Sequence, residues 1–183
     1  KVAEFELVRQ THIDYLTGFN NRGHFMQQAE LELRRVVRYG GTLSIFMMDV
    51  DHFKKINDTY GHKVGDLVLQ KLAAVCRDTL RMIDIIGRVG GEEFAILLPE
   101  TTEQEAIRVA ERLRQAIANV KIPLGHGLPL SITVSIGITS LISKDDNIDV
   151  LLSFADKALY AAKNAGRNRI FNIQDRIGSL VSQ

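Results

Sequence analysis

The chain has 183 residues, of which 45% are hydrophobic and 25% are charged, with fourteen glycines and three prolines. This composition is typical of one soluble globular domain and excludes a disordered or fibrous chain. Twenty-three basic side chains are balanced by twenty-two acidic ones, so the formal net charge of +1 provides no overall field that would hold nucleic acid or an anionic membrane. Any site for a polyanion must therefore be local.

The chain also lacks the sequence features of a membrane-spanning or disulfide-bonded protein. Its nearly apolar runs, such as residues 44–48 and 95–99, are far shorter than the roughly 20 residues that cross a bilayer, and no signal peptide opens it. One cysteine, Cys76, excludes an internal disulfide and a cysteine-rich zinc site. We therefore expect a cytoplasmic segment without membrane contact, whatever anchor a longer protein carries ahead of it.

Two helices and a strand are expected in the first fifty residues. Residues 1–13 have apolar side chains at helical spacing, which predicts the end of a helical linker from a longer protein. The range 21–39 has one apolar helical face, begins at the candidate N-cap Asn21 and stops at a glycine pair. Residues 43–50 are almost continuously apolar, which predicts a strand buried on both faces.

A further helix and a hairpin are expected next. Residues 64–80 repeat apolar side chains at intervals of three and four, which predicts a long helix that covers the sheet. Residues 83–89 and 94–98 indicate two strands joined by a two-residue turn at Gly90-Gly91. Paired glycines favour such a turn because they tolerate the positive φ angles of tight hairpins.

The second half of the chain continues the alternation of helices and strands. Residues 102–105 match a capping box ahead of a third helix, and residues 130–139 alternate apolar side chains like a strand. Asp146 or Asn147 caps a last long helix, after which residues 168–173 are expected to return as an edge strand.

Together these elements predict an α/β (α+β) fold with a mixed central sheet flanked by helices. We place one domain at residues 14–173, between the helical linker remnant of residues 1–13 and a C-terminal tail of residues 174–183. The sequence has no internal repeat and no low-complexity stretch that would indicate a second unit.

Acidic residues gather at two predicted strand ends. The buried strand ends in Asp49-Val50-Asp51, and the hairpin turn is followed by Glu92-Glu93. Carboxylates that are desolvated together repel one another unless a cation or proton intervenes, and their hard oxygens suit Mg²⁺ when substrate phosphates complete its shell. The alternative is that these acids are solvated, as acids at two arbitrary strand ends usually are.

Longer motifs favour the metal site. The sequence reads RVGGEEF at 88–94 and DVDHFKKINDTYGHKVGD at 49–66, with DYLTGFNNR at 14–22 and YAAKNAGRNR at 160–169. In these motifs and their order, residues 14–172 resemble the GGDEF family of diguanylate cyclases, in the GGEEF form. The resemblance implies a fold like that of the polymerase palm and of the purine nucleotide cyclases. It also implies condensation of two GTP into cyclic di-GMP with release of two pyrophosphates.

The resemblance assigns the acidic residues to metal binding and catalysis. The metal ligands would be Asp49, the Val50 carbonyl, Glu92 and Glu93, which would hold two Mg²⁺ or Mn²⁺ ions per active half-site. Two such ions neutralise a triphosphate and lower the pKa of an attacking hydroxyl. Glu92 is also the candidate proton acceptor for the ribose 3′-hydroxyl, and the sequence leaves open whether it acts as a base or only as a ligand.

By the same resemblance, guanine recognition would fall to Asn57 and Asp66, with His62 nearby. A carboxylate accepts hydrogen bonds from N1 and N2 of guanine, and adenine has no such donor pair, so Asp66 favours GTP over ATP. Without the resemblance, Asp66 is equally an acid that interacts with the dipole of a helix, and Asn57 and His62 are turn residues.

The triphosphate would be bound by backbone and basic groups. Backbone N–H groups at the start of a short helix form a common anion site, and the bare backbone of a glycine pair lets a ligand approach closely. The residues expected to bind it are His52, Phe53, Lys54, Gly90, Gly91, Lys163 and Arg167. Alternatively, the basic ones are solvated surface residues, of which the last two complement a helix dipole.

A second nucleotide site is implied beside the hairpin. Residues 81–84 read RMID and end six residues before Gly90. Here Arg81 and Asp84 match the family's product-inhibition site, in which these residue types bind cyclic di-GMP. Arg112, on the following helix, is a candidate accessory contact. As a bare RxxD pattern the segment means little, because such pairs occur often by chance.

The expected partners are GTP, cyclic di-GMP as product and inhibitor, a second copy of the domain and an upstream sensor domain. A dimer is expected because a reaction between two GTP requires each domain to hold one nucleotide and to face its partner. Three departures from the family pattern, at Phe19, Gly23 and Val89, affect no metal, base or guanine position.

Three other functions remain as alternatives. A catalytically silent module that binds GTP or cyclic di-GMP would be signalled by substitutions at Asp49, Glu92 or Glu93, and a cyclase of altered base choice by a change at Asp66. The sequence has neither. A nucleic-acid-binding domain would share the acidic residues, but it would need a basic track and stacking aromatic side chains, which the sequence lacks.

Overall fold

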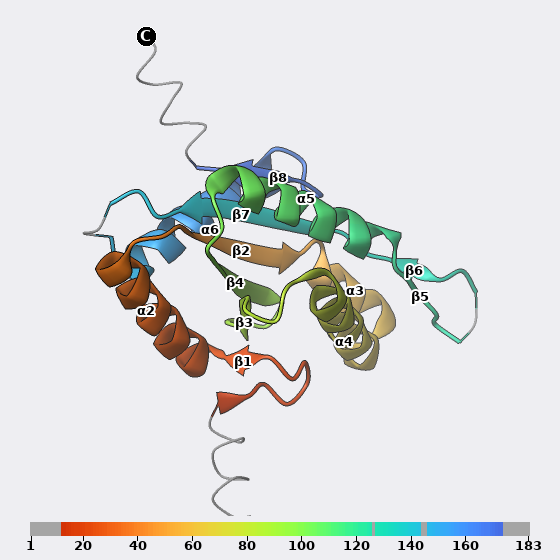
Figure 1. The fold of residues 1–183 in the computed structure, drawn as a ribbon. Coiled ribbons are helices and arrows are strands. Elements are labelled where there is room, and N and C mark those ends of the chain that lie inside the picture. The colour runs from red at the N-terminus through yellow and green to blue at the C-terminus, as the bar shows by residue number, and fades with distance from the viewer. Residues whose placement is uncertain (1–11, 126, 144–145, 174–183) are drawn as a thin grey trace, which may run out of the picture.

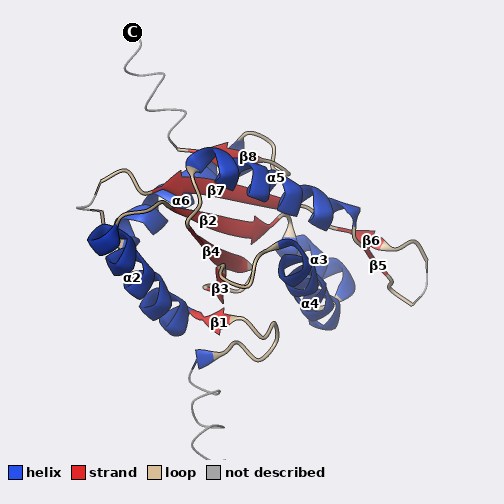
Figure 2. Ribbon diagram, viewed as in Figure 1, coloured by secondary structure: helices blue, strands red, loops and turns tan. Residues whose placement is uncertain are grey.

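A mixed sheet flanked by helices organises residues 12–125, 127–143 and 146–173, the part of the chain that the computed structural model describes (Figure 1 and Figure 2). The strands are β1 Asn20–Asn21, β2 Leu43–Val50, β3 Ile85–Arg88, β4 Glu93–Pro99, β5 Lys121–Ile122, β6 Leu130–Ser131, β7 Val134–Ser140 and β8 Ile170–Asn172. The helices are α2 Arg22–Tyr39, α3 Phe53–Tyr60, α4 His62–Thr79, α5 Glu103–Asn119 and α6 Ile148–Asn164. The expected α/β class is confirmed.

Strand β2 lies at the centre of the main sheet, whose order is β1-β3-β4-β2-β7-β8. It pairs antiparallel with β4 on one side and with β7 on the other, and all eight of its residues are buried. The parallel pairs β1·β3 and β7·β8 form the two edges, so the sheet is mixed and β8 is the expected edge strand. Burial on both faces explains why the β2 sequence shows no alternation of apolar and polar residues.

Successive side chains of β2 contribute to two cores, one on each face of the sheet. Ile45 and Met47 pack with α2 and α6, whereas Phe46 and Met48 pack with α3, α4 and α5. Figure 1 shows α5 and α6 on opposite sides of the sheet. The C-terminal end of β2 is therefore reached from both layers, by α3 and by the end of α6.

The helix starts agree with the signals in the sequence. Asn21 caps α2, with its side chain accepting a hydrogen bond from a backbone N–H at 3.0 Å, and Thr102 and Glu105 form the expected capping box of α5. Of the two candidate caps of α6, Asn147 is the one used, because its side chain accepts from the Val150 N–H at 2.9 Å.

The hairpin turn is wider than the predicted two residues. Four residues, 89–92, connect β3 to β4, and the Val89 and Gly90 N–H groups both donate to the Glu93 carbonyl. Neither Gly90 nor Gly91 adopts a positive φ. The prediction of a two-residue turn with left-handed glycines is therefore wrong, because the carbonyl of Glu93 closes a longer loop.

The strand expected over residues 130–139 is divided between two sheets. Strand β6 pairs with β5 in a separate two-stranded sheet, and β7 begins only at Val134. Between them, the Thr133 carbonyl accepts from the Asp51 N–H at 2.9 Å, and the Thr133 hydroxyl donates to the Asp51 carboxylate at 2.7 Å. Periodicity does not reveal this break, because Ile132 and Val134 are both buried.

Two expectations concern residues outside the described ranges. The helical linker of residues 1–13 lies outside them except for its last two residues, and the tail of residues 174–183 lies outside them entirely. Among the described residues, none of the helices has the length and apolar character that crossing a membrane requires.

Candidate active site

The pairing of β2 with β4 brings the expected metal ligands together. Asp49 lies opposite Glu93 in the antiparallel register, and the Val50 N–H donates to the Glu92 carbonyl at 3.3 Å. Asp49 is buried, whereas Glu92 and Glu93 are half-buried. Acids from two distant segments of the chain therefore meet at one end of the sheet.

Asp49 occupies an unfavourable environment for an ionised carboxylate. It is 6% exposed, and its Oδ2 lies 2.8 Å from Nζ of Lys163, on α6. The pKa of Asp49 is raised to about 6, chiefly by burial and to a smaller extent by the negative charges of Glu92 and Glu93, which together outweigh the lowering by Lys163. A bound cation would relieve the resulting excess of negative charge.

We expect Asp49→Asn to make the metal-free domain more stable at alkaline pH. Because folding raises the pKa of Asp49 from 3.8 to about 6, its stabilising contribution is fully present below the lower value and is lost as the pH rises through the higher one. At pH 8 the substitution should raise the free energy of unfolding by about 1 to 3 kcal/mol, and at pH 4.5 by much less. Thermal unfolding with a chelator at both pH values measures this, with Asp58→Asn, at an exposed position, as control. An equal effect at the two pH values would contradict the expectation.

The donor set at this end of the sheet fits a hard divalent cation that shares its ligands with a substrate. Carboxylates and a backbone carbonyl are the oxygen ligands that Mg²⁺ and Mn²⁺ prefer. Within the described ranges, no three carboxylate, imidazole or thiol side chains form a preformed metal cluster. The ions would therefore need substrate oxygens in addition to the four residues that would hold them, Asp49, Val50, Glu92 and Glu93.

The first glycine of the turn is explained by its contact with Glu93. A Cβ at Gly90 would overlap Oε2 of Glu93, whereas a Cβ at Gly91 would meet nothing within 4 Å. The turn is also held by Arg88, whose Nη2 donates to the Gly91 carbonyl at 2.7 Å and whose Nη1 donates to the Asp14 carboxylate at 3.1 Å. Arg88 was not anticipated as part of the site, and it ties the turn to the segment before α2.

Helix α3 begins directly after β2, where the anion site is expected. His52 is its N-cap, in the left-handed conformation with a φ of 58°, and Phe53 is its first residue. The His52 side chain makes no capping hydrogen bond, and Lys54 is exposed in the first turn. His52, Phe53 and Lys54 thus lie together at the start of α3, and their role at the triphosphate stays a prediction.

The expected guanine-reading residues lie on the neighbouring helices α3 and α4. Asn57 lies on α3, and His62 and Asp66 are exposed on α4. Oδ1 of Asn57 is buried without a hydrogen-bond partner among the described residues, which is uncommon for a buried polar atom. Gly65 makes room for it, since a Cβ at Gly65 would overlap the Asn57 amide. A glycine inside a predicted helix was the one signal by which sequence reasoning could have found this contact.

We expect Gly65→Ala to weaken GTP binding with little effect on turnover. The added methyl group displaces the Asn57 amide, so the KM for GTP should rise about ten-fold while kcat changes little. Steady-state kinetics at saturating metal measures the two constants. Lys71→Ala, at an exposed position of the same helix, is the control, and an equal rise in its KM would contradict the explanation.

The two cations expected to bind phosphate at the end of α6 have different surroundings. Lys163 is engaged with Asp49. Arg167 follows the helix and is exposed, and its guanidinium forms no hydrogen bond or ion pair with the residues that the structure describes. We call Asp49, Glu92 and Glu93 the acid cluster. The ammonium group of Lys163 is therefore bound to this cluster, whereas the guanidinium of Arg167 is available to an anion.

Asp51 lies apart from Asp49, Glu92 and Glu93, with which the sequence analysis placed it. It is 4% exposed, and it accepts hydrogen bonds from the hydroxyls of Thr133 and Ser135 and from the Asn168 N–H. Strand β2 ends at Val50, so the two acids diverge where the chain enters the following helix. Asp51 is therefore a buried structural carboxylate.

The residues expected to bind product lie together ahead of β3. Nη2 of Arg81 donates to Oδ1 of Asp84 at 3.1 Å and to the hydroxyl of Thr101 at 2.6 Å. Arg112 donates to the carbonyl of Thr79, two residues before Arg81, at 3.0 Å. The structure thus assembles the three residues, and their binding of a nucleotide stays a prediction.

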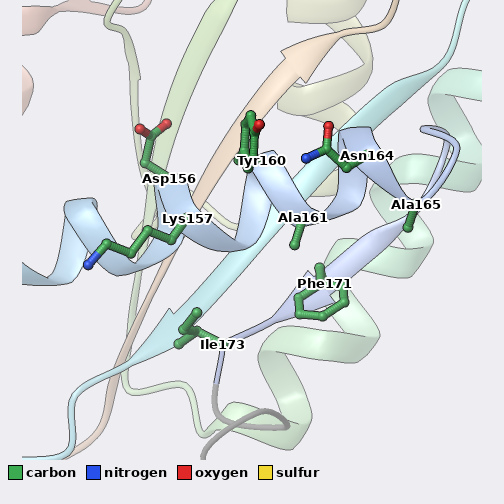
Figure 3. A pocket seen from close by; sticks show the side chains of 8 residues that line it. All are labelled: Asp156, Lys157, Tyr160, Ala161, Asn164, Ala165, Phe171 and Ile173. Carbon is green, nitrogen blue, oxygen red and sulfur yellow. The ribbon is translucent and has the colours of Figure 1, made fainter.

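Cavity size alone does not identify this site. A cavity of about 690 Å³ lies between the outer side of α6 and β8, where Tyr160, Asn164 and Phe171 line it (Figure 3). None of the residues expected to bind metal, GTP or product lines it. A smaller hollow of about 380 Å³ is bordered by Glu93 and Met47 and so adjoins the acid cluster.

Comparison with known proteins agrees with this arrangement. Residues 11–169 match the family model described as diguanylate cyclase, GGDEF domain. The chain is 45% identical over 157 residues to diguanylate cyclase DgcP of Pseudomonas aeruginosa and 39% identical over 158 residues to response regulator PleD of Caulobacter vibrioides. Each alignment covers 86% of this chain but only 23% of DgcP and 35% of PleD, so the chain spans about a third or less of their length.

Solved structures show the same fold at domain length. The GGDEF domain of DgcB from Caulobacter crescentus, solved in complex with c-di-GMP, superposes with a TM-score of 0.84 at 30% identity. The match covers 88% of this chain and 93% of that one. Together with the family model, which spans most of the residues, this places the chain in the GGDEF family of diguanylate cyclase domains.

Proposed function

We propose that the domain condenses two GTP molecules into cyclic di-GMP and two pyrophosphates. In each half of the reaction, the 3′-hydroxyl oxygen of one GTP bonds to the α-phosphorus of the other. The bond from that phosphorus to pyrophosphate breaks, and the hydroxyl proton passes to a base. The observation that best supports this reaction is the strand register, which sets Asp49 opposite Glu93. Lys163 contacts the carboxylate of Asp49.

The acid cluster would provide the metal site and the base. Asp49, Glu92, Glu93 and the Val50 carbonyl would hold two Mg²⁺ or Mn²⁺ ions, which when bound neutralise phosphate charge and acidify the attacking hydroxyl. In our proposal Glu92, half-buried in the turn, accepts the proton of that hydroxyl. The buried position of Asp49 supports a role as metal ligand for Asp49 and as base for Glu92, because it leaves the two glutamates nearer to a bound nucleotide.

The rest of the substrate would be bound by α3, α4 and the end of α6. Asn57 and Asp66 would read the guanine edge, and their positions on the consecutive helices α3 and α4 support that role. Arg167, with the first N–H groups of α3, would bind the phosphates. A preference for GTP over ATP follows, because only guanine presents donors to the Asp66 carboxylate.

We further propose that two domains face each other in a two-fold dimer, each contributing one GTP. Specific activity should then climb with enzyme concentration in the dilute range and level off when dimers saturate. An upstream domain of a longer protein would control this encounter, and cyclic di-GMP bound at Arg81 and Asp84 would inhibit it.

Incubation of the purified domain with GTP and Mg²⁺, followed by mass detection of products, tests the proposal. We expect cyclic di-GMP and pyrophosphate in a ratio of one to two, no cyclic product from ATP, and no activity with a chelator. Absence of product at high enzyme concentration, combined with calorimetric binding of GTP or cyclic di-GMP, would instead identify a silent binding module.

A further inference from the structure

The segment that carries Arg167 has an unusual backbone. Gly166, Arg167 and Asn168 follow α6 with φ values of 115°, 61° and 46°. One left-handed residue is enough to end a helix, and glycine adopts that conformation freely. The left-handed conformation is unfavourable for Arg167, whereas asparagine adopts it more readily, so surrounding contacts must hold Arg167 there.

Three contacts hold this segment: the Arg167 N–H donates to the Ala162 carbonyl at 3.1 Å, Nη1 of Arg114 donates to Oδ1 of Asn168 at 2.5 Å, and the Asp51 carboxylate accepts from the Asn168 N–H. Oδ2 of Asp51 accepts from the Asn168 N–H at 2.9 Å and from the Thr133 hydroxyl at 2.7 Å, and its Oδ1 accepts from the Ser135 hydroxyl at 2.7 Å. Ser135 lies on β7, and Thr133 directly precedes that strand. The sheet therefore fixes the carboxylate, and the carboxylate attaches the segment to the sheet at the Asn168 N–H.

The end of β2 thus holds the end of α6 at two points. Nζ of Lys163 meets Oδ2 of Asp49 at 2.8 Å, and the Asn168 N–H meets Oδ2 of Asp51 at 2.9 Å. Arg167 lies between these attachments in the sequence. Its backbone is fixed, while its exposed guanidinium has no partner among the described residues.

We infer that Asp51 is a positioning residue, which orients Arg167 for phosphate binding by fixing residues 166–168 against β2. The inference rests on the proposed function, because it takes the guanidinium of Arg167 as a phosphate-binding group. Asp51 acts through the backbone of Asn168 and does not touch the substrate. Loss of the Asp51 carboxylate lets residues 166–168 relax, so the KM for GTP rises by a larger factor than kcat falls.

Two substitutions of Asp51 separate this role from a general one in folding. With its oxygen in the place of Oδ2, Asn keeps an acceptor for the Asn168 N–H and the Thr133 hydroxyl, and its amide N–H can donate to the Ser135 hydroxyl in the place of Oδ1. We expect Asp51→Ala to raise the KM for GTP about ten-fold with a smaller change in kcat, and Asp51→Asn to restore most of the loss. Adding Arg167→Ala to Asp51→Ala should raise the KM for GTP little further, because both substitutions act on the contact between Arg167 and phosphate.

Hydrogen exchange of the nucleotide-free domain provides a readout that needs no activity. In Asp51→Ala the Asn168 amide should exchange at least about ten-fold faster, while amides in the centre of β2 and β7 keep their parent rates. Ser44→Ala is the matched control. Ser44 is also buried on β2, but its hydroxyl hydrogen-bonds to Ser140 and to the Thr101 carbonyl at the other end of the strand. It should change neither the exchange of Asn168 nor the KM.

An unchanged Asn168 exchange rate in Asp51→Ala would overturn the inference, as would an equal effect of Ser44→Ala. Faster exchange throughout the sheet in both Asp51 variants would assign the carboxylate to folding in general and would overturn it as well. If the parent domain forms no cyclic di-GMP, the proposed function fails separately. The exchange rates and calorimetric GTP affinities of the same variants then decide the role of Asp51.

Discussion

Asp49→Asn and Glu93→Gln should each lower the rate of cyclic di-GMP formation by at least ~10²-fold, equivalent to about 2.7 kcal/mol of transition-state stabilisation. The two acids lie opposite each other across the β2·β4 pairing, so either substitution removes half of a facing pair of carboxylates. The amide side chains preserve size and accept hydrogen bonds, but they are poor ligands for a hard divalent cation. Catalysis should therefore be lost while the fold is retained.

Initial rates at saturating GTP over a range of Mg²⁺ concentrations measure this loss. Glu30→Gln, an equivalent change at a half-buried position on α2 where the carboxylate pairs with Arg34, should keep the parent rate. Thermal unfolding of Asp49→Asn under the assay conditions checks that its inactivity is not due to misfolding, since we expect this variant to be no less stable than the parent when the metal is removed at pH 8. Near-full activity of either site variant would refute the assignment of the metal ligands.

Signals that act over a few residues predicted most of the fold. The cap at Asn21 and the capping box at residues 102–105 depend on contacts within one helical turn, so the sequence contains all that determines them. The run at 43–50 is buried at every position, as its lack of alternation indicates. The wider hairpin turn escaped prediction because the carbonyl that closes it belongs to the second strand.

The remaining features of the site depend on contacts between distant segments. Lys163 was expected at the phosphates alone, and only the folded chain shows that it contacts Asp49. The importance of Gly65 arises from an amide on another helix. Asp51 follows Asp49 so closely that composition cannot separate them, although their hydrogen bonds give them different roles. Motifs identify the residue types of a site, whereas packing decides which of them bind and which support.

Arg81→Ala should accumulate more cyclic di-GMP than the parent at long times, with its initial rate little changed. Arg81 and Asp84 precede β3, and this strand, Ile85–Arg88, separates them from the turn that carries the proposed metal ligands. Product bound there would act on domain assembly or mobility rather than by occupying the GTP site. Inhibition should therefore be non-competitive with GTP, as a distinct site requires.

The chemistry of the pair suits this one ligand. The Arg81 side chain is 48% exposed and lies 3.1 Å from the Asp84 carboxylate, which is 2% exposed. A guanidinium binds a phosphate or a guanine edge through two hydrogen bonds, and a carboxylate accepts from N1 and N2 of guanine once the arginine moves aside. Losing the arginine should weaken product binding by roughly 1.5 to 3 kcal/mol, which raises the inhibition constant more than about ten-fold.

Progress curves with added cyclic di-GMP compare the parent with Arg81→Ala and with Arg108→Ala, which removes the same charge from an exposed position on α5. The Arg108 variant should keep the parent inhibition constant. Equal constants for the parent and Arg81→Ala would show that the guanidinium serves only its local hydrogen bonds to Asp84 and Thr101. Competitive inhibition would place the product in the GTP site instead, because two ligands that exclude each other share one site.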